Sequence, residues 1–273
     1  MFVWLASYPK SGNTLLRSML AAYLFSKDGI YDFNLIKNIK QFPHGGLFIK
    51  MGIDIKNHNE TIKNYIKAQE SFNKKEAVQF LKTHSYLFNF NKENPFTDFN
   101  NTLGVIYVVR DPRNVVTSFS KYRGLTNEEM ADFMIKGSGD GLTWTNNWAS
   151  NFHSWKLFKE DERYLLIKYE DLINKRESTF LNILNFIHKI TKSKLVLDKE
   201  KFDNVITTTS FENMQKLEKE KGFSEAGINQ KTGEKVPFFN LGPKNDWRQS
   251  LNPTIIQKIE KAFKKEMKEL GYL

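Results

Sequence analysis

The chain has 273 residues, which is enough for one sizeable α/β domain or two small ones. It contains no cysteine, so disulfides, cysteine zinc sites and a thiol nucleophile are excluded, and it has no apolar run long enough to predict a membrane span. The net charge of +10 favours anionic partners such as nucleic acid, lipid headgroups or phosphorylated small molecules, although lysines that merely solvate helices give the same total.

A short apolar run over residues 2–6 predicts a buried parallel strand. The apolar run from Met1 to Ala6 has no basic stretch before it and is too short for a signal peptide, so we expect a cytoplasmic protein. After the polar stretch SYPKSGNT, apolar residues return with helical spacing at Leu15, Leu16, Met19, Leu20, Tyr23 and Leu24. The polar stretch therefore joins the end of a strand to the start of a helix.

This loop has the composition of an anion-binding site. Lys10 supplies a charge, Ser11, Asn13 and Thr14 supply short polar groups, and Gly12 would let an anion approach the unpaired N–H groups of the helix. Alternatively, Ser11 or Asn13 caps the helix and no ligand is needed. The Walker pattern GxxxxGK[ST] is absent, so a triphosphate with Mg²⁺ is not expected.

A second apolar strand over residues 103–109 leads into RDPRNVVTS. Arg110 then stands at the carboxyl end of a strand, where open α/β sheets bind ligands, and its guanidinium can grip a phosphate with two hydrogen bonds. Ser118 follows on the next predicted helix. Alternatively, Arg110 pairs with Asp111 or Asp171 as part of the scaffold.

The segment FLKTHSYLF (80–88) brings a lysine and a histidine together. In an extended chain, Lys82 and His84 point the same way because they are two residues apart. The nearby cation lowers the pKa of the imidazole, which keeps it neutral and able to accept a proton. Alternatively, this histidine is structural, as single histidines more often are.

The remaining patterns predict the architecture. Residues 164–169 form another strand candidate, and strand–loop–helix units of this kind imply a three-layer α/β fold with a parallel sheet between helices. Residues 27–75 and 120–145 predict long loops and short helices around a site. Pro253 to Leu270 predicts an amphipathic closing helix. No linker divides the chain, so we predict one domain over residues 1–273.

Taken together, these motifs resemble the sulfotransferases that use 3′-phosphoadenosine 5′-phosphosulfate (PAPS). YPKSGNT resembles their 5′-phosphosulfate loop YPKSGTTW, RDPRNVVTS their 3′-phosphate element RNPxDxxxS, and LKTH the segment with their catalytic histidine. The resemblance spans nearly the whole chain and implies a P-loop-like sheet. Further similar segments follow in the family's order: WASNFHSW, KYEDL, TSFENM and GPKNDW.

The resemblance implies a role for each matching residue. His84 would be the general base, assisted by Lys82 and by Lys10 at the breaking bond. Arg110 and Ser118 would hold the 3′-phosphate. The full set of donor-binding residues would be Lys10, Ser11, Gly12, Asn13, Thr14, Arg110, Ser118, Tyr169 (nucleotide), Thr209 and Phe211 (adenine), Gly242 and Lys244.

Three departures from the family pattern bear on nucleotide affinity. Leu15 replaces the tryptophan that stacks on adenine, and Asn240 and Leu241 replace an Arg-Lys pair. Asn245 replaces the glycine before Asp-Trp. We expect Lys244 to supply a substitute cation.

The implied function is sulfuryl transfer from PAPS, with PAP as product and without a metal, to a hydroxyl or amine of a small-molecule, lipid or saccharide acceptor. Neither nucleic acid nor a membrane span is expected. One alternative is a non-catalytic PAP-binding protein of the same fold, which would be expected to lose His84 or Lys10 first. Another is a P-loop small-molecule kinase, which would need a Walker lysine.

The acceptor pocket is expected from the least patterned segments, residues 27–55, 84–95, 120–155 and 222–240. Aromatic residues in these segments would suit an apolar or ring-bearing acceptor, or would simply be core. They are Phe42, Phe48, Tyr86, Phe88, Trp144 and Trp148.

Overall fold

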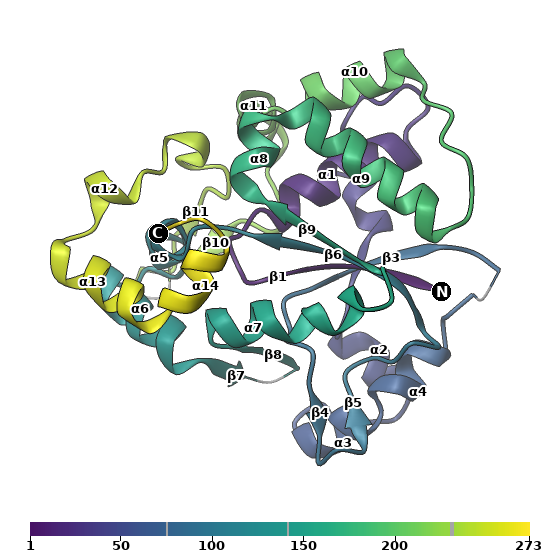
Figure 1. The fold of residues 1–273 in the computed structure, drawn as a ribbon, viewed down its shortest axis with the longest axis horizontal. Helices are drawn as coiled ribbons and strands as arrows, with labels where there is room; N and C mark the ends of the chain where they lie inside the picture. Colours follow the sequence, from purple (N-terminus) through teal and green to yellow (C-terminus); the bar gives the residue numbers. More distant parts are fainter. Residues whose placement is uncertain (75, 141, 230–231) are drawn as a thin grey trace.

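The computed structural model describes residues 1–74, 76–140, 142–229 and 232–273 (Figure 1). At its centre is a five-stranded sheet of order β2-β3-β1-β6-β9 in which every neighbouring pair is parallel. The predicted parallel sheet is thus confirmed. Its strands are β1 (Phe2–Ser7), β2 (Lys40–Gln41), β3 (Gln79–Thr83), β6 (Thr102–Val109) and β9 (Tyr164–Lys168).

Helices cover both faces of this sheet, which confirms the three-layer prediction. The helices α1, α9 and α10 lie on one face and α7 lies on the other (Figure 1). Their bounds are α1 (Asn13–Phe25), α2 (Gly45–Lys50), α3 (His58–Lys63), α4 (Tyr65–Glu70), α5 (Pro112–Arg123), α6 (Asn127–Lys136), α7 (Trp148–Trp155), α8 (Tyr169–Asn174), α9 (Arg176–Ile190), α10 (Lys199–Thr208), α11 (Phe211–Lys221), α12 (Trp247–Ser250), α13 (Pro253–Ala262) and α14 (Lys264–Glu269).

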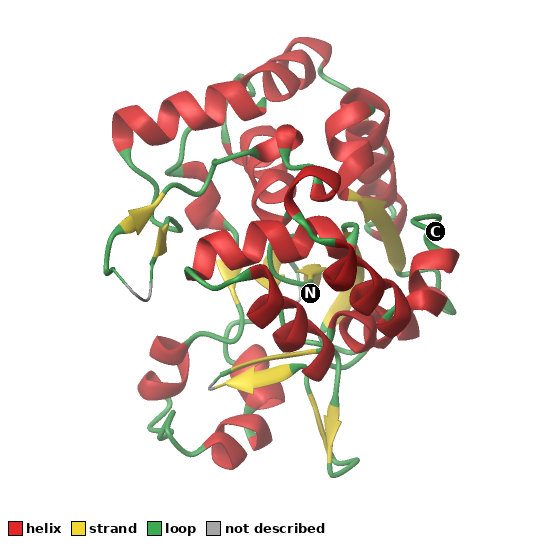
Figure 2. Cartoon of the chain, turned by 90° about the vertical axis from the view of Figure 1, so that its left-hand side faces the viewer, coloured by secondary structure: helices red, strands yellow, loops and turns green. Residues whose placement is uncertain are grey.

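Short elements fill the connections, where the sequence predicted loops and short helices. Figure 2 shows the small strand pairs lying away from the central sheet. These pairs are β4 (Asn89–Phe90) with β5 (Asn94–Pro95), β7 (Ser138–Asp140) with β8 (Thr143–Asn146), and β10 (Gly227–Ile228) with β11 (Lys235–Val236). The 3₁₀ turns are η1 (Leu35–Asn38), η2 (Lys156–Lys159) and η3 (Gly242–Lys244).

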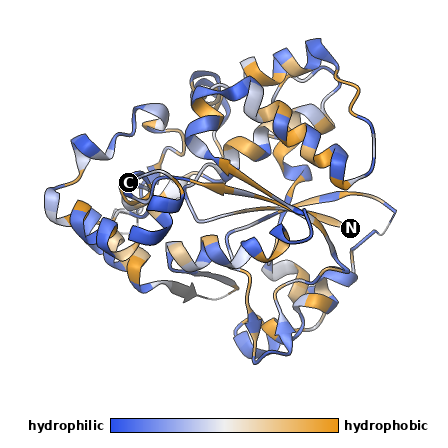
Figure 3. Cartoon of the chain, in the orientation of Figure 1, coloured by the Kyte–Doolittle hydropathy of each residue, from blue (hydrophilic) through white to orange (hydrophobic). Residues whose placement is uncertain are grey.

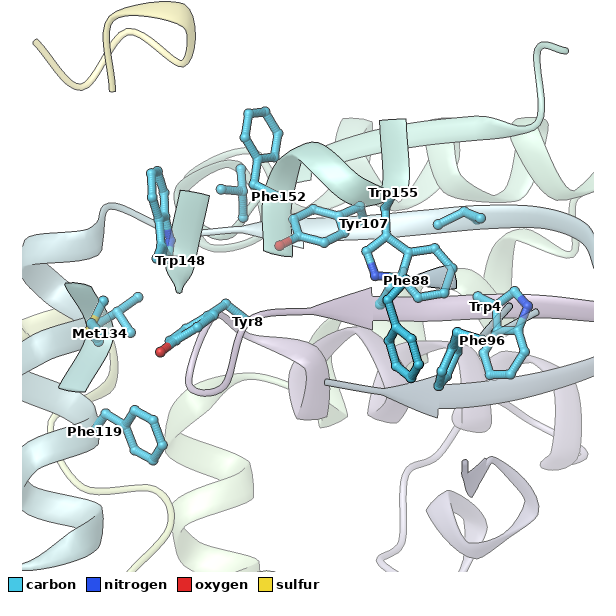
Figure 4. Packing of buried hydrophobic residues seen from close by; sticks show 14 of the residues in the cluster. Trp4, Tyr8, Phe88, Phe96, Tyr107, Phe119, Met134, Trp148, Phe152 and Trp155 are labelled. Atoms are coloured by element: carbon cyan, nitrogen blue, oxygen red, sulfur yellow. The ribbon is translucent and has the colours of Figure 1, made fainter. Parts of the chain in front are cut away.

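The central strands supply two cores because successive side chains of a strand point to opposite faces. On β1, Phe2 and Trp4 belong to one buried cluster and Val3 and Leu5 to the other. The ring of Trp4 lies 5.4 Å from that of Phe96, within a layer of aromatic side chains (Figure 4). The hydrophobic colouring is accordingly concentrated on the central strands, while the outer helices carry hydrophilic faces (Figure 3).

The closing helix differs from the prediction in one respect. It is interrupted at Phe263, which leaves the helical conformation between α13 and α14. The predicted apolar face still packs inward, because Phe263, Met267 and Leu270 are buried in the same cluster as Trp4. Within the residues that the model describes, no helix has the length and apolar character needed to cross a bilayer.

Candidate active site

A cavity of about 480 Å³ lies at the carboxyl edge of the sheet. Its walls come from the loop after β1, the ends of β3 and β6, and the chain around residues 236–242. Most of the predicted site residues line this one cavity, although they are far apart in the sequence. They are Lys10, Gly12, Asn13, Thr14, Lys82, His84, Arg110, Ser118, Tyr169, Phe211 and Gly242.

The loop after β1 leaves the N-terminus of α1 open toward the cavity. Gly12 is the residue before the helix, and no side chain caps it, so the alternative of a simple capped helix is not observed. Asn13 instead donates to the carbonyl of Leu5 at 2.8 Å. Gly12 has φ +103, and a Cβ there would approach the ring of Tyr169 to 2.4 Å. A glycine is therefore required, and the first N–H groups of the helix stay available.

Lys10 lies in this loop with the left-handed φ of 63°. Its ammonium is 3.8 Å from the ring centroid of Phe238 and 4.2 Å from that of Tyr122. Burial lowers the pKa of Lys10 to about 7, and the positive charge of Arg110 is the second cause of this shift. An anion bound beside it would favour the charged form, so this lysine is suited to a negatively charged ligand.

Arg110 is also held toward the cavity. Its guanidinium lies over the ring of Tyr169 at 4.2 Å and donates to the carbonyl of Lys10 at 3.1 Å. Its Nε is buried and has no partner among the described residues, and the same is true of the hydroxyl of Ser11. A buried donor is costly unless a ligand or water satisfies it, and Arg110, unlike Ser11, lines the cavity, so its Nε favours an anion at this end.

The scaffold alternative for Arg110 is not observed. Asp111 instead accepts hydrogen bonds from Arg113, with the shortest at 2.7 Å, and Asp171 pairs with Lys175 at 3.3 Å. Arg110 is therefore left for the cavity, with Ser118 exposed to it from the next helix.

His84 has the geometry of a neutral base. Its Nδ1 lies 2.9 Å from the carbonyl oxygen of Ser7. Because a carbonyl only accepts, Nδ1 carries the hydrogen and Nε2 keeps its lone pair. Burial lowers the pKa of His84 to about 3, and the positive charge of Lys82 is the second cause of this shift. The imidazole thus stays uncharged at neutral pH, as the sequence predicted from the neighbouring lysine.

Glu225 is an acidic residue of this site that the sequence analysis missed. It accepts from Arg17 at 2.6 Å and from Thr14 at 3.1 Å, and it lies 3.9 Å from the ammonium of Lys82. Burial works to raise the pKa of Glu225, but Lys82 and Arg17 outweigh it and hold the pKa at about 2. Burial lowers the pKa of Lys82 to about 8, and the charge of Glu225 limits that fall.

The only sequence signal for this cluster was Arg17. It is the one charged residue in the first helix and lies among apolar positions, where a buried arginine needs a partner. Nothing in the sequence identified which acid, 208 positions away, would supply it.

The departures from the family pattern have local explanations. Leu15 and Met214 line the cavity and belong to one hydrophobic cluster, against which Phe211, also a lining residue, packs. The side chain of Asn245 accepts from Thr117 at 2.9 Å and donates to the carbonyl of Asn114 at 2.9 Å, which ties the chain after η3 to α5. Gly242 has φ +51, and a Cβ there would lie 2.2 Å from Phe211.

Some predicted residues do not line the cavity. Thr209 is fully buried and accepts from Arg176 at 3.0 Å, and Lys244 is exposed on η3, so neither contacts the space where a ligand would lie. Ser11 is fully buried in the loop after β1 and does not line the cavity. Among the described residues, the six aromatics proposed for the acceptor pocket also stay outside it: Phe42, Phe48, Tyr86, Phe88, Trp144 and Trp148 all belong to or pack against the hydrophobic core.

Comparisons with known proteins agree on the family. The family model described as "Sulfotransferase domain" matches residues 2–271. An amine sulfotransferase of Oryctolagus cuniculus is 25% identical over 182 residues, which are 62% of this chain and 56% of that protein. Cytosolic sulfotransferase 13 of Arabidopsis thaliana is 23% identical over 277 residues, covering 96% of this chain and 76% of its own.

Solved structures agree on the fold. A mouse sulfotransferase complexed with PAP has a TM-score of 0.64 at 20% identity and covers 99% of this chain and 86% of its own. A retinol dehydratase complexed with retinol and PAP also has a TM-score of 0.64, at 18% identity, and covers 98% of this chain and 81% of its own. At these identities the likeness concerns the fold alone.

Proposed function

The chain belongs to the sulfotransferase family, and from that premise we propose that it moves a sulfuryl group from PAPS to a hydroxyl or amine of an acceptor molecule. The observation that carries this proposal is one cavity in which the open end of α1, the cations Lys10, Lys82 and Arg110, and a neutral histidine meet. The two related structures named above were solved with PAP, which supports the same donor here.

The donor would lie along the wall formed by the loop after β1 and by α5. Lys10 and the first N–H groups of α1 would bind its 5′-phosphosulfate, and Arg110 with Ser118 would bind its 3′-phosphate. The unpartnered Nε of Arg110 fits this role because it is a buried donor in need of an acceptor. Leu15, Phe211 and Met214 would give adenine an apolar slot in place of the family's tryptophan.

His84 would take the proton of the attacking group. As the acceptor oxygen or nitrogen bonds to sulfur, its proton passes to Nε2, and the bond from sulfur to the phosphate oxygen breaks. A positioned base of this kind contributes roughly 10²–10⁴-fold to the rate. The hydrogen bond from Nδ1 to Ser7 would hold the ring in the required tautomer throughout.

Two lysines would stabilise the charge that develops on the leaving phosphate. Lys10 and Lys82 both line the cavity, and a cation aimed at a developing charge stabilises the transition state more than the ground state. We propose that these lysines supply the countercharge without a metal. Glu225 would act through Lys82, because its carboxylate favours the charged ammonium.

The acceptor is proposed to be a small molecule, a lipid or a saccharide that acts in the cytoplasm. The rabbit relative is named for an amine acceptor, which supports small acceptors in this family. The aromatic side chains that line the cavity differ from those expected from the sequence. They are Phe119, Tyr122, Phe133, Tyr169, Phe211, Phe238 and Phe239.

Two measurements test this function. Calorimetric titration with PAP is expected to give saturable one-site binding, and incubation with ³⁵S-labelled PAPS and a panel of phenols, sugars, lipids and amines is expected to label at least one acceptor. Saturable PAP binding without transfer to any acceptor class would favour the non-catalytic binder. Absence of PAP binding would refute the donor assignment itself.

A further inference from the structure

Arg123 is a cavity residue that the proposed reaction does not use. It stands in the last turn of α5, lines the cavity and is half-buried. Within residues 1–74, 76–140, 142–229 and 232–273 its guanidinium forms no ion pair or hydrogen bond; its contacts are the rings of Phe119 and Phe133, at 5.7 and 5.9 Å. An arginine held on aromatic rings keeps its charge and presents its donors to whatever enters.

Arg123 faces a different part of the cavity from the proposed 3′-phosphate site. At 100° per residue, positions 118 and 123 lie about 140° apart around the axis of α5. The ring of Phe119, against which Arg123 lies, makes an edge contact with Tyr8 at 6.5 Å (Figure 4). Tyr8 directly follows Ser7, whose carbonyl orients His84. Arg123 thus belongs to the side of the cavity where the acceptor must approach the base.

The charges around the cavity leave Arg123 without a counterion. Among the described residues that line the cavity, Glu225 is the only acid, and it is held by Arg17 and Thr14. Of the other cations that line the cavity, Lys10 and Arg110 are assigned to the phosphates of the donor, Lys82 lies beside Glu225, and Lys121 is exposed to solvent. An acceptor that carries an anion would be repelled by those phosphates unless a separate cation met it. Arg123 is placed to be that cation.

We propose that Arg123 binds an anionic group of the acceptor, so that the substrate is a small alcohol, phenol or amine that also carries a carboxylate, phosphate or sulfate. The planar guanidinium suits each of these groups because it can donate two parallel hydrogen bonds. The rings of Phe119 and Phe133 would contact the apolar part of the same molecule. This inference rests on the proposed sulfuryl transfer and specifies its substrate class.

Matched probes test the inference. With PAP bound, the affinity of the protein for 4-hydroxyphenylacetate is compared by calorimetry with that for 4-hydroxyphenylacetamide, which has the same ring and hydroxyl but no charge. A third probe, 4-hydroxybenzylphosphonate, tells a phosphate-like anion from a carboxylate. Charge-assisted hydrogen bonds of this kind predict that one of the anions binds roughly tenfold to a hundredfold more tightly than the amide.

Three variants assign the preference to Arg123. In Arg123→Met, the ratio of the affinity for the anion to the affinity for the amide is expected to fall close to one. Arg123→Lys is expected to keep part of the preference for the anion because the charge remains. Lys136→Met removes one exposed charge from the end of α6 and is expected to keep the ratio. PAP binding by each variant confirms that it is folded.

The outcomes separate this inference from its premise. Equal binding of the anions and the amide by the parent protein, with PAP bound, would overturn the inference and leave the donor assignment intact. An anion preference that survives in Arg123→Met would overturn it as well. If PAP itself does not bind, the proposed function fails and the inference fails with it.

Discussion

The cavity has two walls that are held in different ways. The strand wall consists of Lys82 in β3, His84 and Arg110 directly after β3 and β6, and Lys10 in the loop after β1. The cover segment, residues 222–229 and 232–242, contains one two-residue strand pair, and a side chain of α11 binds its backbone at Phe238 and Phe239. The residues of the strand wall are thus positioned by the backbone hydrogen bonds of the sheet. The cover segment instead depends on particular charged and aromatic side chains.

Polar and cation–aromatic contacts join the cover segment to α1 and to the strand wall. Glu225 of the cover segment reaches Arg17 and Thr14, and Phe238 lies against the ammonium of Lys10. Glu218 of α11 anchors the segment by accepting from the backbone of Phe238 at 2.8 Å. The comparison therefore predicts that changes in the strand wall affect chemistry and donor binding, while changes in the cover segment affect stability and the charge of Lys82.

The largest effect is expected for His84→Ala. Loss of the base should lower the transfer rate roughly 10²–10⁴-fold while PAP affinity changes little. The measurement is the turnover of ³⁵S-labelled PAPS beside calorimetric PAP binding. His58→Ala, which removes an exposed histidine of α3, is the matched control. Transfer by His84→Ala at the parent rate would show that the base is another group.

The second effect concerns Arg110→Ala. We expect PAP to bind roughly tenfold to a hundredfold more weakly, because a charged pair with the 3′-phosphate is lost. The control ligand is 5′-AMP, which lacks that phosphate, and its affinity should fall much less. If the affinities for PAP and for 5′-AMP fell by the same factor, Arg110 would act only through its hydrogen bond to the carbonyl of Lys10.

The third effect tests the cover segment. Glu225→Gln should lower the free energy of unfolding by about 1.5–3 kcal/mol, because the charged partner of Arg17 is lost. It should also lower the pKa of Lys82, so that the decline of kcat/KM with rising pH begins at lower pH. Denaturant melts and pH profiles check both results. Glu220→Gln, at an exposed position of α11, is expected to change neither, and identical behaviour of the two variants would contradict the assigned role.

The smallest effect is expected for Asn245→Gly, which restores the family's residue. It removes the hydrogen bonds with Thr117 and Asn114 and should cost about 1 kcal/mol of unfolding free energy, with PAP affinity nearly unchanged. Asn245→Asp keeps an acceptor for Thr117 but sets a carboxylate oxygen against the carbonyl of Asn114, so it should lower the unfolding free energy at least as much as Asn245→Gly. A large loss of PAP affinity in either variant would place Asn245 in donor binding.

Much of the fold and of the strand wall could be predicted from the sequence. Apolar runs over residues 2–6 and 103–109 identified central strands, and the polar residues directly after them had to lie at one edge of the sheet. Residues two apart, such as Lys82 and His84, share a side of an extended chain, and both do line the cavity. These inferences needed only local spacing.

The cover segment could not be predicted because its contacts are long-range. Glu225 meets Arg17 across 208 positions, and no local pattern distinguishes it from other glutamates. The same limit explains why Phe119 and Phe133 line the cavity, whereas Phe42 and Trp148 of the same hydrophobic cluster do not. The placement of Thr209 was also beyond local spacing, because its hydroxyl accepts from Arg176 and does not reach the cavity.

The most direct test of the account is the protonation change that accompanies PAP binding at pH 8, measured by calorimetry in two buffers of different ionisation enthalpy. The phosphates of PAP are already deprotonated there, since their second pKa is about 6, whereas Lys10, with a pKa of about 7, is largely neutral. The account predicts saturable binding with proton uptake, reduced in Lys10→Met. Binding without proton uptake, or with equal uptake in Lys10→Met, would contradict the placement of Lys10 against the donor.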